Sequence, residues 1–356
     1  MEERADVPLA GLTTMRVGGP AARLVTVTTT DDLVDAIREV DDADEPLLVL
    51  SGGSNVLVAD EGFPGTVVQV ATSGVRVESA DACSGAFVTV AAGESWDGFV
   101  ARAVAEGWVG VEALSGIPGL TGATPIQNVG AYGQEVAQTI ARVRVWDRRE
   151  QRVQTWAAAD CGFTYRHSRF KGTDRWVVLD VSFQLRLADL SGPIAYAALA
   201  AGLNVPVGAR VPLAEARDAV LAQRRARGMV LDAADHDTWS CGSFFTNPIV
   251  SQEQFAEVVA RTAQRLGPDV PVAHWADASG GVKVSAAWLI EHSGFGKGYG
   301  AAGPASLSTK HTLALTNRGG ATAADVLALA REVRAGVAAA YGVTLVNEPV
   351  LVGLTL

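Results

Sequence analysis

The sequence predicts an α+β protein with two or three domains. The chain has 356 residues, which is enough for more than one hydrophobic core. Its composition, 48% hydrophobic and 19% charged, is typical of a folded globular protein. Strand-like and helix-like segments are mixed along the whole chain, and no internal repeat or flexible linker separates them.

The first elements form a small α/β unit within residues 22–75. Residues 24–27 and 47–50 are short apolar runs, which predict buried strands. Between them a helix is expected to begin at Asp31, because apolar residues then recur with helical spacing. The residues on that helical face are Leu33, Ile37 and Val40.

The next region, roughly residues 73–225, combines strands and helices without a regular order. Strands are predicted at 87–91, 143–146 and 176–180. A helix is predicted between Ser95, as its N-cap, and Gly107. A further helix is expected from about Leu213 to Arg227.

Helix-capping signals organise the last third of the chain. Helices are expected to begin at Ser251, Ser285 and Thr322 and to alternate with strands. Gln254 and Asp325 complete capping-box patterns, while Gly267 and Gly342 mark helix ends. We place the domain boundaries at 1–72, 73–232 and 233–356.

The charge balance disfavours some classes of partner. The formal net charge is −10, from 39 acidic and 29 basic residues, without a basic run. This disfavours a nucleic-acid partner or an anionic membrane surface. An anionic substrate would need a local basic pocket.

The N-terminus and the cysteines indicate a cytoplasmic protein. The first residues are acidic, and no apolar run reaches the length of a membrane span. Cys83, Cys161 and Cys241 are far apart and form no CxxC pattern, which fits a reducing compartment and disfavours a zinc site. The five histidines show no metal-ligand spacing, so no metal is expected. We expect a monomer.

A glycine-rich turn follows the strand at 47–50. It has the sequence Ser51-Gly52-Gly53-Ser54-Asn55, and the following residues 56–58 are again strand-like. A strand on each side removes the helix dipole of a Rossmann turn, leaving consecutive backbone N–H groups as a nest for a pyrophosphate. An ordinary turn is the alternative.

The most informative segment is residues 115–133, which is uncharged and rich in glycine, proline, hydroxyls and amides. Its glycines allow close approach to a bound group, and Pro118 and Pro125 stiffen the path. Thr121, Thr124, Gln127 and Asn128 offer neutral donors and acceptors for a planar heterocycle. We interpret the segment as a ligand-binding loop, with a long structural loop as the alternative.

Three further sites carry groups suited to acid and anion chemistry. They are Tyr165-Arg166, Ser243 and Glu348. Together they offer an anion clamp, a small proton donor and a carboxylic acid, which suits stabilising and protonating an enolate-like intermediate. Individually they could be a surface pair, a turn or cap hydroxyl, and a strand-edge acid.

Six motifs in order resemble the UDP-N-acetylenolpyruvoylglucosamine reductase family and span nearly the whole chain. They are Thr13–Pro20, Ser51–Asn55, Ile117–Gly133, Tyr165-Arg166, Gly242–Pro248 and Asn347–Pro349.

The resemblance implies a three-domain α+β fold, with two domains forming a flavin-binding unit like that of vanillyl-alcohol oxidase and a third binding substrate. FAD would be non-covalent, with NADPH as reductant and a nucleotide sugar as substrate. The implied FAD contacts are Ser51, Gly52, Gly53, Ser54, Asn55, Pro118, Gly119, Gly122, Ala123, Gln127, Asn128, Gly130, Ala131 and Tyr132.

The same resemblance implies the reaction. NADPH reduces FAD and leaves, and flavin N5 then delivers hydride to C3 of the enolpyruvyl group. Arg166 and Glu348 would stabilise the resulting negative charge, and Ser243 would protonate C2. The product would be UDP-N-acetylmuramate, a peptidoglycan precursor.

Substrate contacts implied by the family are Tyr165, Tyr196 and Asn247. Tyr196 corresponds to the substrate-loop tyrosine of the longer subtype, with an apolar core position as the alternative. Arg227 and Thr246 depart from residues common in relatives. A related FAD-dependent small-alcohol oxidase and a non-catalytic nucleotide-binding module are the competing functions.

Overall fold

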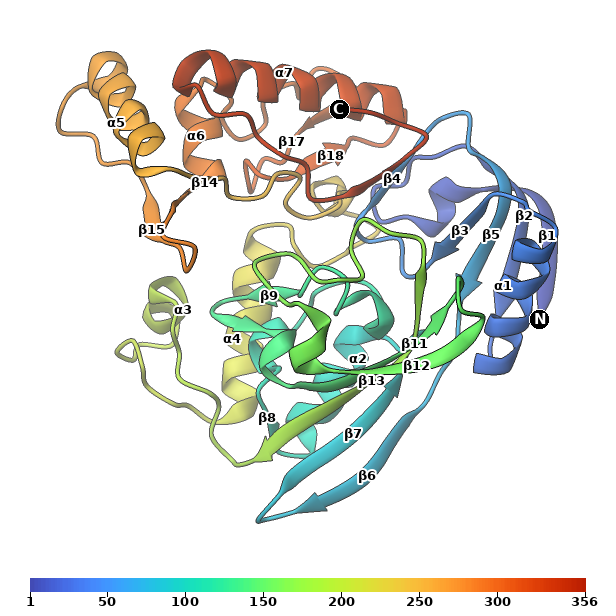
Figure 1. Cartoon of the computed structure of the whole chain (residues 1–356). Coiled ribbons are helices and arrows are strands. Elements are labelled where there is room, and N and C mark those ends of the chain that lie inside the picture. Colours follow the sequence, from blue (N-terminus) through green and yellow to red (C-terminus); the bar gives the residue numbers. More distant parts are fainter. The chain divides into compact units, whose positions relative to one another are not determined.

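The computed structural model describes residues 1–356 and confirms the predicted α+β class (Figure 1). The chain divides into two compact units. The first comprises residues 1–7, 20–53 and 63–230, and the second comprises 8–19, 54–62 and 231–356. The second unit thus takes two short segments from the N-terminal part of the chain.

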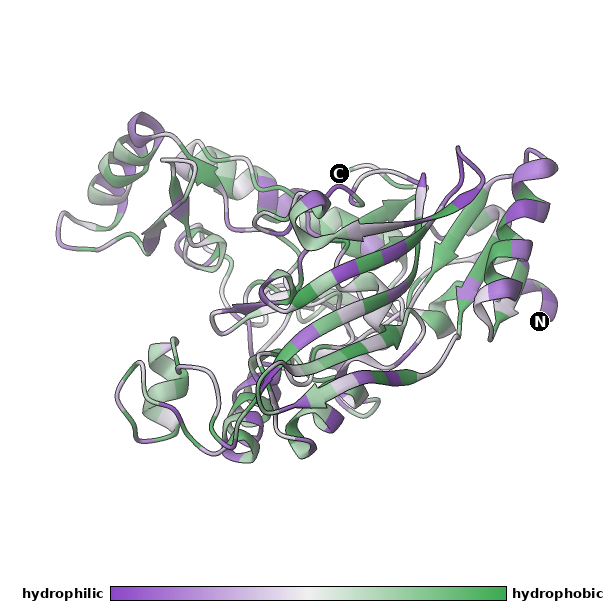
Figure 2. Cartoon of the chain, turned by 60° about the horizontal axis from the view of Figure 1, so that its bottom comes forward, coloured by the Kyte–Doolittle hydropathy of each residue, from purple (hydrophilic) through white to green (hydrophobic).

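The first sheet of unit one has the strand order β1-β2-β5-β3. Its strands are Glu2–Pro8, Pro20–Val27, Phe63–Val70 and Leu47–Leu50 in that order. Strands β2 and β3 both run parallel to β5. The helix α1 (Thr30–Asp42) has the predicted buried face, and its polar residues lie on the opposite side (Figure 2). Its N-cap is Thr29, whose hydroxyl accepts from the Asp32 N–H.

The second sheet of unit one is antiparallel, in the order β12-β11-β13-β7-β6, and β8 also pairs with β13. Its strands are Arg152–Ala157, Ile140–Asp147, Trp176–Leu187, Gly85–Ala91, Val75–Asp81 and, for β8, Trp108–Val109. Apolar and polar residues alternate along several of these strands, as expected for a sheet with one buried face (Figure 2). The strands predicted at 87–91, 143–146 and 176–180 are confirmed, because they lie within β7, β11 and β13.

Helices cover the buried side of this unit. The helix α2 (Trp96–Ala105) begins at the predicted N-cap Ser95. Trp96, Phe99 and Phe183 of β13 form an aromatic cluster, with ring centroids 5.0–5.9 Å apart. The helices α3 (Ala197–Gly202) and α4 (Leu213–Ala226) pack on a smaller core beside it.

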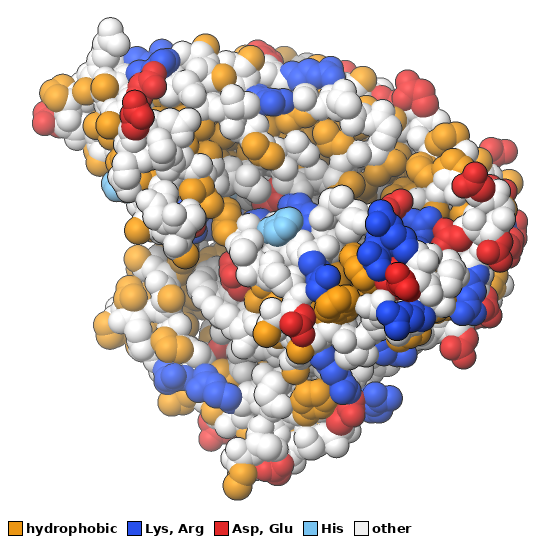
Figure 3. Space-filling model, viewed as in Figure 1, with side chains coloured by type: hydrophobic (Ala, Val, Ile, Leu, Met, Phe, Trp, Pro, Cys, Tyr) orange, Lys and Arg blue, Asp and Glu red, His pale blue; other side chains and the backbone are white.

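Several charged side chains on this unit form ion pairs. Basic and acidic groups are interspersed over the face that carries β11 and β13 (Figure 3). Arg144 contacts Asp180, and Arg175 lies 2.7 Å from the fully buried carboxylate of Asp147. This face therefore carries mixed charge rather than a basic patch.

Unit two contains three α-helices and small sheets. The helices are α5 (Gln252–Leu266), α6 (Ala286–His292) and α7 (Ala323–Tyr341). All three begin after the predicted caps, and Gly342 ends α7 with the left-handed φ of 71°. None of the helices in the molecule combines the length and apolar character that crossing a bilayer would require.

The strands of unit two are short. One sheet has the order β14-β16-β15, and the remaining strands form the pairs β17-β18 and β19-β4. Their bounds are Ile249–Val250 (β14), Val282–Val284 (β16), His274–Ala276 (β15), Ala305–Leu307 (β17), Leu315–Asn317 (β18), Val350–Val352 (β19) and Val56–Val58 (β4). The predicted strand at 56–58 exists, but its partner is the C-terminal strand β19, in parallel register.

The segment after β4 also fixes the start of α7. The carboxylate of Asp60 accepts hydrogen bonds from the backbone N–H groups of Ala323 (2.7 Å) and Ala324 (2.9 Å). Because the first N–H groups of a helix have no partner within it, a residue far away in sequence supplies the acceptors. Met15, Val17 and Leu57 add apolar contacts to the same core.

Replacing Asp60 by Ala should lower the unfolding free energy of unit two by about 1–2 kcal/mol, because two helix N–H groups lose their acceptor. Denaturant titration measures the change. Glu61→Ala, at the adjacent exposed acid, is the matched control and should stay within about 0.5 kcal/mol of wild type. Equal effects of the two substitutions would contradict the capping role.

Thiol accessibility gives a second test. Cys83 is exposed, whereas Cys161 and Cys241 are buried. Burial raises the pKa of Cys161 to about 11 and that of Cys241 to about 12, so both stay protonated at pH 8. A thiol reagent at pH 8 should modify Cys83 rapidly and the other two only after unfolding. Rapid labelling of Cys241 in the folded Cys83→Ser variant would contradict this packing.

Candidate active site

Hydrogen bonds to other residues of unit one hold the loop at 115–133 in place. The N–H of Thr121 donates to the carbonyl of Glu94 (2.9 Å), and that of Gly122 donates to Ala92 (2.8 Å). At its start, the Gly116 N–H donates to the carboxylate of Asp97 (2.6 Å). The only helical portion is the 3-10 turn Thr121–Ala123. The loop is thus long and irregular, as predicted, but its path is fixed.

Three polar side chains of the loop serve its own structure. The hydroxyl of Thr121 donates to Glu94 O (3.1 Å), and that of Thr124 donates to Thr121 O (2.8 Å). Asn128 is 1% exposed, and its amide donates to Glu135 and to the carbonyl of Thr164. These hydrogen bonds fasten the loop internally and to neighbouring segments, and the expected contact of these residues with a ligand stays a prediction.

The predicted phosphate turn approaches this loop closely. A Cβ atom added to Gly52 would lie 2.7 Å from the Cα of Gly119, so only glycine allows this approach. Beside it, the hydroxyl of Ser51 is buried and has no hydrogen-bond partner in the protein. A buried polar atom without a partner is costly, and a ligand atom would remove that cost.

Residues 130–135 form a tight hairpin at the end of the loop. Strands β9 (Gly130–Ala131) and β10 (Gln134–Glu135) pair antiparallel. Tyr132 and Gly133 connect them with φ values of 50° and 89°, which is the conformation of a type I′ turn. The turn places Tyr132 at its tip.

Tyr132 contacts the segment that carries Tyr196. The two rings meet edge to face with centroids 5.6 Å apart. Tyr196 is 43% exposed, so the alternative of an apolar core position is wrong. The structure leaves its phenol accessible, as a substrate contact requires.

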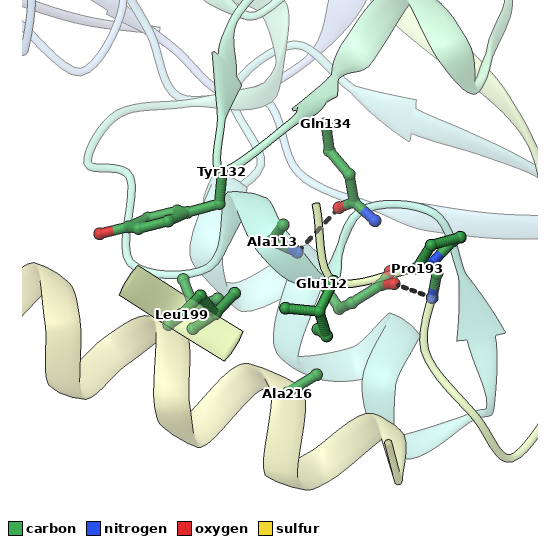
Figure 4. Close-up of a pocket in the computed structure, with 10 residues that line it drawn as sticks. Glu112, Ala113, Tyr132, Gln134, Pro193, Leu199 and Ala216 are labelled. Carbon is green, nitrogen blue, oxygen red and sulfur yellow. Dashed lines mark hydrogen bonds between the residues drawn. The ribbon is translucent and has the colours of Figure 1, made fainter. Parts of the chain in front are cut away.

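A narrow pocket beneath Tyr132 shows how the Tyr196 segment is fastened (Figure 4). The buried carboxylate of Glu112 accepts from the Gly192 N–H (2.6 Å), and the Ala113 N–H donates to Gln134 (2.8 Å). Leu199 and Ala216 provide the apolar side of this pocket (Figure 4). Glu112 was not among the predicted site residues, although it lies three residues before the uncharged loop.

Positive charge lies close to Tyr132. Burial lowers the pKa of Arg224 to about 10, so this guanidinium is still charged at neutral pH. Burial raises the pKa of Tyr132, and the charges of Arg227 and Arg224 act in the opposite direction. The sequence required a local basic pocket for an anionic ligand, and these two arginines supply positive charge beside the loop.

Arg166 lies at the tip of a turn in unit one. Thr164 and His167 exchange backbone hydrogen bonds of 3.0 and 3.2 Å, which leaves Tyr165 and Arg166 as the connecting residues. The guanidinium donates to the carbonyls of Gly130 (2.6 Å) and Asn128 (3.3 Å). The candidate anion clamp is therefore oriented by the backbone of the glycine-rich loop.

Ser243 and Glu348 belong to adjacent segments of unit two. The Glu348 N–H donates to the carbonyl of Phe244 (2.8 Å), and Phe245 forms a bridge with Asn347. Ser243 caps none of the helices, which removes one of its structural explanations. The fold therefore brings the segments of the predicted proton donor and carboxylic acid together.

Two predicted ligand residues also support this part of the site. The amide of Asn55 donates to the carbonyl of Glu348 (3.3 Å), and the Val350 N–H donates to the carbonyl of Asn55 (3.0 Å). The side-chain oxygen of Asn247 accepts from the Ala286 N–H at the start of α6 (2.9 Å). That bond orients the Asn247 amide nitrogen as a donor.

Two protein-family models match the chain. The "FAD binding domain" model matches residues 21–155, and the "UDP-N-acetylenolpyruvoylglucosamine reductase, C-terminal domain" model matches residues 233–352.

Relatives in several bacteria and a solved structure are similar to this chain over nearly its full length. The reductase of Thermobifida fusca is 60% identical, covering 99% of this chain and 98% of the relative. That of Streptomyces coelicolor is 56% identical, covering 100% of this chain and 92% of the relative. The crystal structure of the Thermus caldophilus reductase is 26% identical with a TM-score of 0.64, covering 99% of this chain and 98% of that one. This chain therefore belongs to the UDP-N-acetylenolpyruvoylglucosamine reductase family.

Proposed function

We propose that this protein is a flavoenzyme that uses NADPH to reduce UDP-N-acetylglucosamine enolpyruvate to UDP-N-acetylmuramate. The observation that carries the proposal is the backbone pairing between Phe244 and Glu348. This pairing joins the segment that carries the Ser243 hydroxyl to the segment that carries the Glu348 carboxylic acid. The chain also matches UDP-N-acetylenolpyruvoylglucosamine reductases over nearly its full length. An oxidase of small alcohols would need neither group.

The residues present fit FAD. The unpartnered, buried hydroxyl of Ser51 and the close approach of Gly52 to Gly119 leave backbone and hydroxyl groups for a ligand at the predicted phosphate turn. Residues from Pro118 to Tyr132 would hold the rest of the cofactor, within the stretch that matches the FAD-binding model. When bound, FAD would supply a carrier that moves hydride from NADPH to the enolpyruvyl double bond.

The side chains of the protein control charge and protons around that transfer. Hydride addition at C3 places negative charge on C2 and the adjoining carboxylate of the substrate. Arg166, already oriented by the Gly130 and Asn128 carbonyls, would stabilise this charge, and Glu348 would act with it. Preorganised donors are effective because they need no reorientation during the reaction.

Ser243 would complete the reaction by donating its hydroxyl proton to C2. Addition of hydride at C3 and a proton at C2 converts the enol ether to the saturated lactyl ether. A serine hydroxyl is a weak acid, so this step depends on the basicity of the enolate and on neighbours that stabilise the alkoxide. Tyr165, Tyr196 and Asn247 would bind the remainder of the nucleotide sugar.

We further propose a monomeric, cytoplasmic enzyme. The three cysteines are free thiols, which supports a reducing compartment. Light scattering on the purified protein gives its oligomeric state.

Replacing Ser243 by Ala should separate the two half-reactions. In anaerobic stopped-flow experiments, NADPH should bleach the flavin of wild type and variant at similar rates. Adding the enolpyruvyl sugar should restore the wild-type flavin band quickly but that of the variant about 10²–10⁴ times more slowly, because the proton donor is missing. Ser73→Ala, at an exposed serine, is the matched control and should behave as wild type.

Two results would overturn the proposal. Flavin reoxidation that occurs only on admitting air would indicate an oxidase. Equal slowing of both half-reactions in the Ser243 variant would exclude its role as the proton donor.

A further inference from the structure

We propose that Glu135 is a positioning residue for the reaction, acting through Arg166. The inference rests on the proposed function, in which Arg166 stabilises the substrate-derived anion. Glu135 lies in β10, two residues beyond the uncharged loop that the sequence highlighted. Its two carboxylate oxygens face different partners, and both partners determine where the Arg166 guanidinium lies.

The first partner is Arg166 itself. Its Nη1 atom lies 3.6 Å from Oε1 of Glu135, and its side chain is only 20% exposed. Arg166 has a φ of 52°, a backbone conformation that L-amino acids adopt at a cost in free energy. The surrounding contacts must therefore stabilise it. Lys171 contributes by donating to the Arg166 carbonyl (3.1 Å).

The second partner is the side chain of Asn128. Its Nδ2 atom donates to Oε2 of Glu135 (2.8 Å) and to the carbonyl of Thr164 (3.0 Å). Its Oδ1 atom accepts from the Ala137 N–H (3.2 Å). Asn128 therefore links the loop to the turn that carries Arg166, and its own carbonyl accepts one of the Arg166 hydrogen bonds.

The backbone holds Glu135 firmly in place. It pairs with Gly130 across the hairpin, and its N–H donates to the side chain of Gln138 (3.2 Å). A Cβ atom on Gly130 would lie 2.8 Å from Cγ of Glu135 and 2.9 Å from Nη1 of Arg166. The three residues therefore form one closely packed frame, with the carboxylate bridging the loop amide and the guanidinium.

We expect Glu135 to affect the reaction rate more than the folding stability. The Glu135 side chain is 36% exposed, and an ion pair at this exposure contributes little to folding. Misplacing a catalytic group by about 1 Å can nevertheless cost roughly 10²-fold in rate. Removing the charge should therefore affect the reaction much more than the fold.

The test is Glu135→Gln, which keeps the size of the side chain and an oxygen acceptor for Asn128. Flavin reduction by NADPH should stay within about twofold of wild type, while reoxidation by the enolpyruvyl sugar should slow about 10- to 100-fold. Glu150→Gln removes an exposed acid 3.8 Å from Arg175 and is the matched control, expected to match wild type. Unchanged reoxidation in Glu135→Gln would overturn the proposal.

A double variant tests whether Glu135 acts through Arg166. Adding Glu135→Gln to Arg166→Ala should cause no further slowing, because the residue being positioned is already absent. A further slowing by the full Glu135→Gln factor would contradict the proposed route. Equal loss of both half-reactions, together with weakened FAD binding, would show a merely structural role.

A measurement without turnover keeps this inference separate from the proposed function. Arginine-selective NMR of the FAD-bound protein reports the exchange of the Arg166 Nη–H groups with water. Glu135→Gln should accelerate this exchange, and an unchanged rate would overturn the positioning role. Failure of the wild-type protein to complete the anaerobic cycle would instead refute the proposed function.

Discussion

The site in unit one depends on two backbone hydrogen bonds, from Thr121 N–H to Glu94 O and from Gly122 N–H to Ala92 O. They fasten the middle of the uncharged loop to the stretch that joins β7 and α2. The Trp96 N–H at the start of α2 also donates to the carbonyl of Gly119 (3.1 Å), beside the closely approaching Gly52. Because hydrogen bonds within the chain hold the loop, binding need not order it, which reduces the entropic cost of association.

The segments that carry the candidate catalytic groups are held by backbone hydrogen bonds. Arg166 is oriented by two carbonyls of the fixed loop, and the segments of Ser243 and Glu348 are paired with each other. Asn55 also forms hydrogen bonds with the backbone of Glu348 and Val350, the residues on either side of Pro349. Backbone scaffolds of this kind fix the segments from which the chemically active side chains extend.

Much of the fold could be predicted from local patterns. Ser95, Ser251 and Thr322 cap helices because capping depends on residues three positions apart. The pairing of β4 with β19 could not be predicted, because no local signal in Val56–Val58 identifies a partner almost 300 residues away. The same limit explains Asn128, whose amide looked available in sequence but is buried by contacts with Glu135 and Thr164. Glu135 itself was overlooked because it lies just outside the uncharged stretch.

The most direct test of this account is a crystal structure of the protein with FAD bound. The account predicts that the flavin lies along residues 118–132, that the Ser51 hydroxyl gains a hydrogen bond from or to the cofactor, and that Arg166 keeps its bonds to the Gly130 and Asn128 carbonyls. A flavin bound elsewhere, or a loop that leaves Ala92 and Glu94 to accommodate it, would contradict the claim that the chain alone preforms its cofactor site.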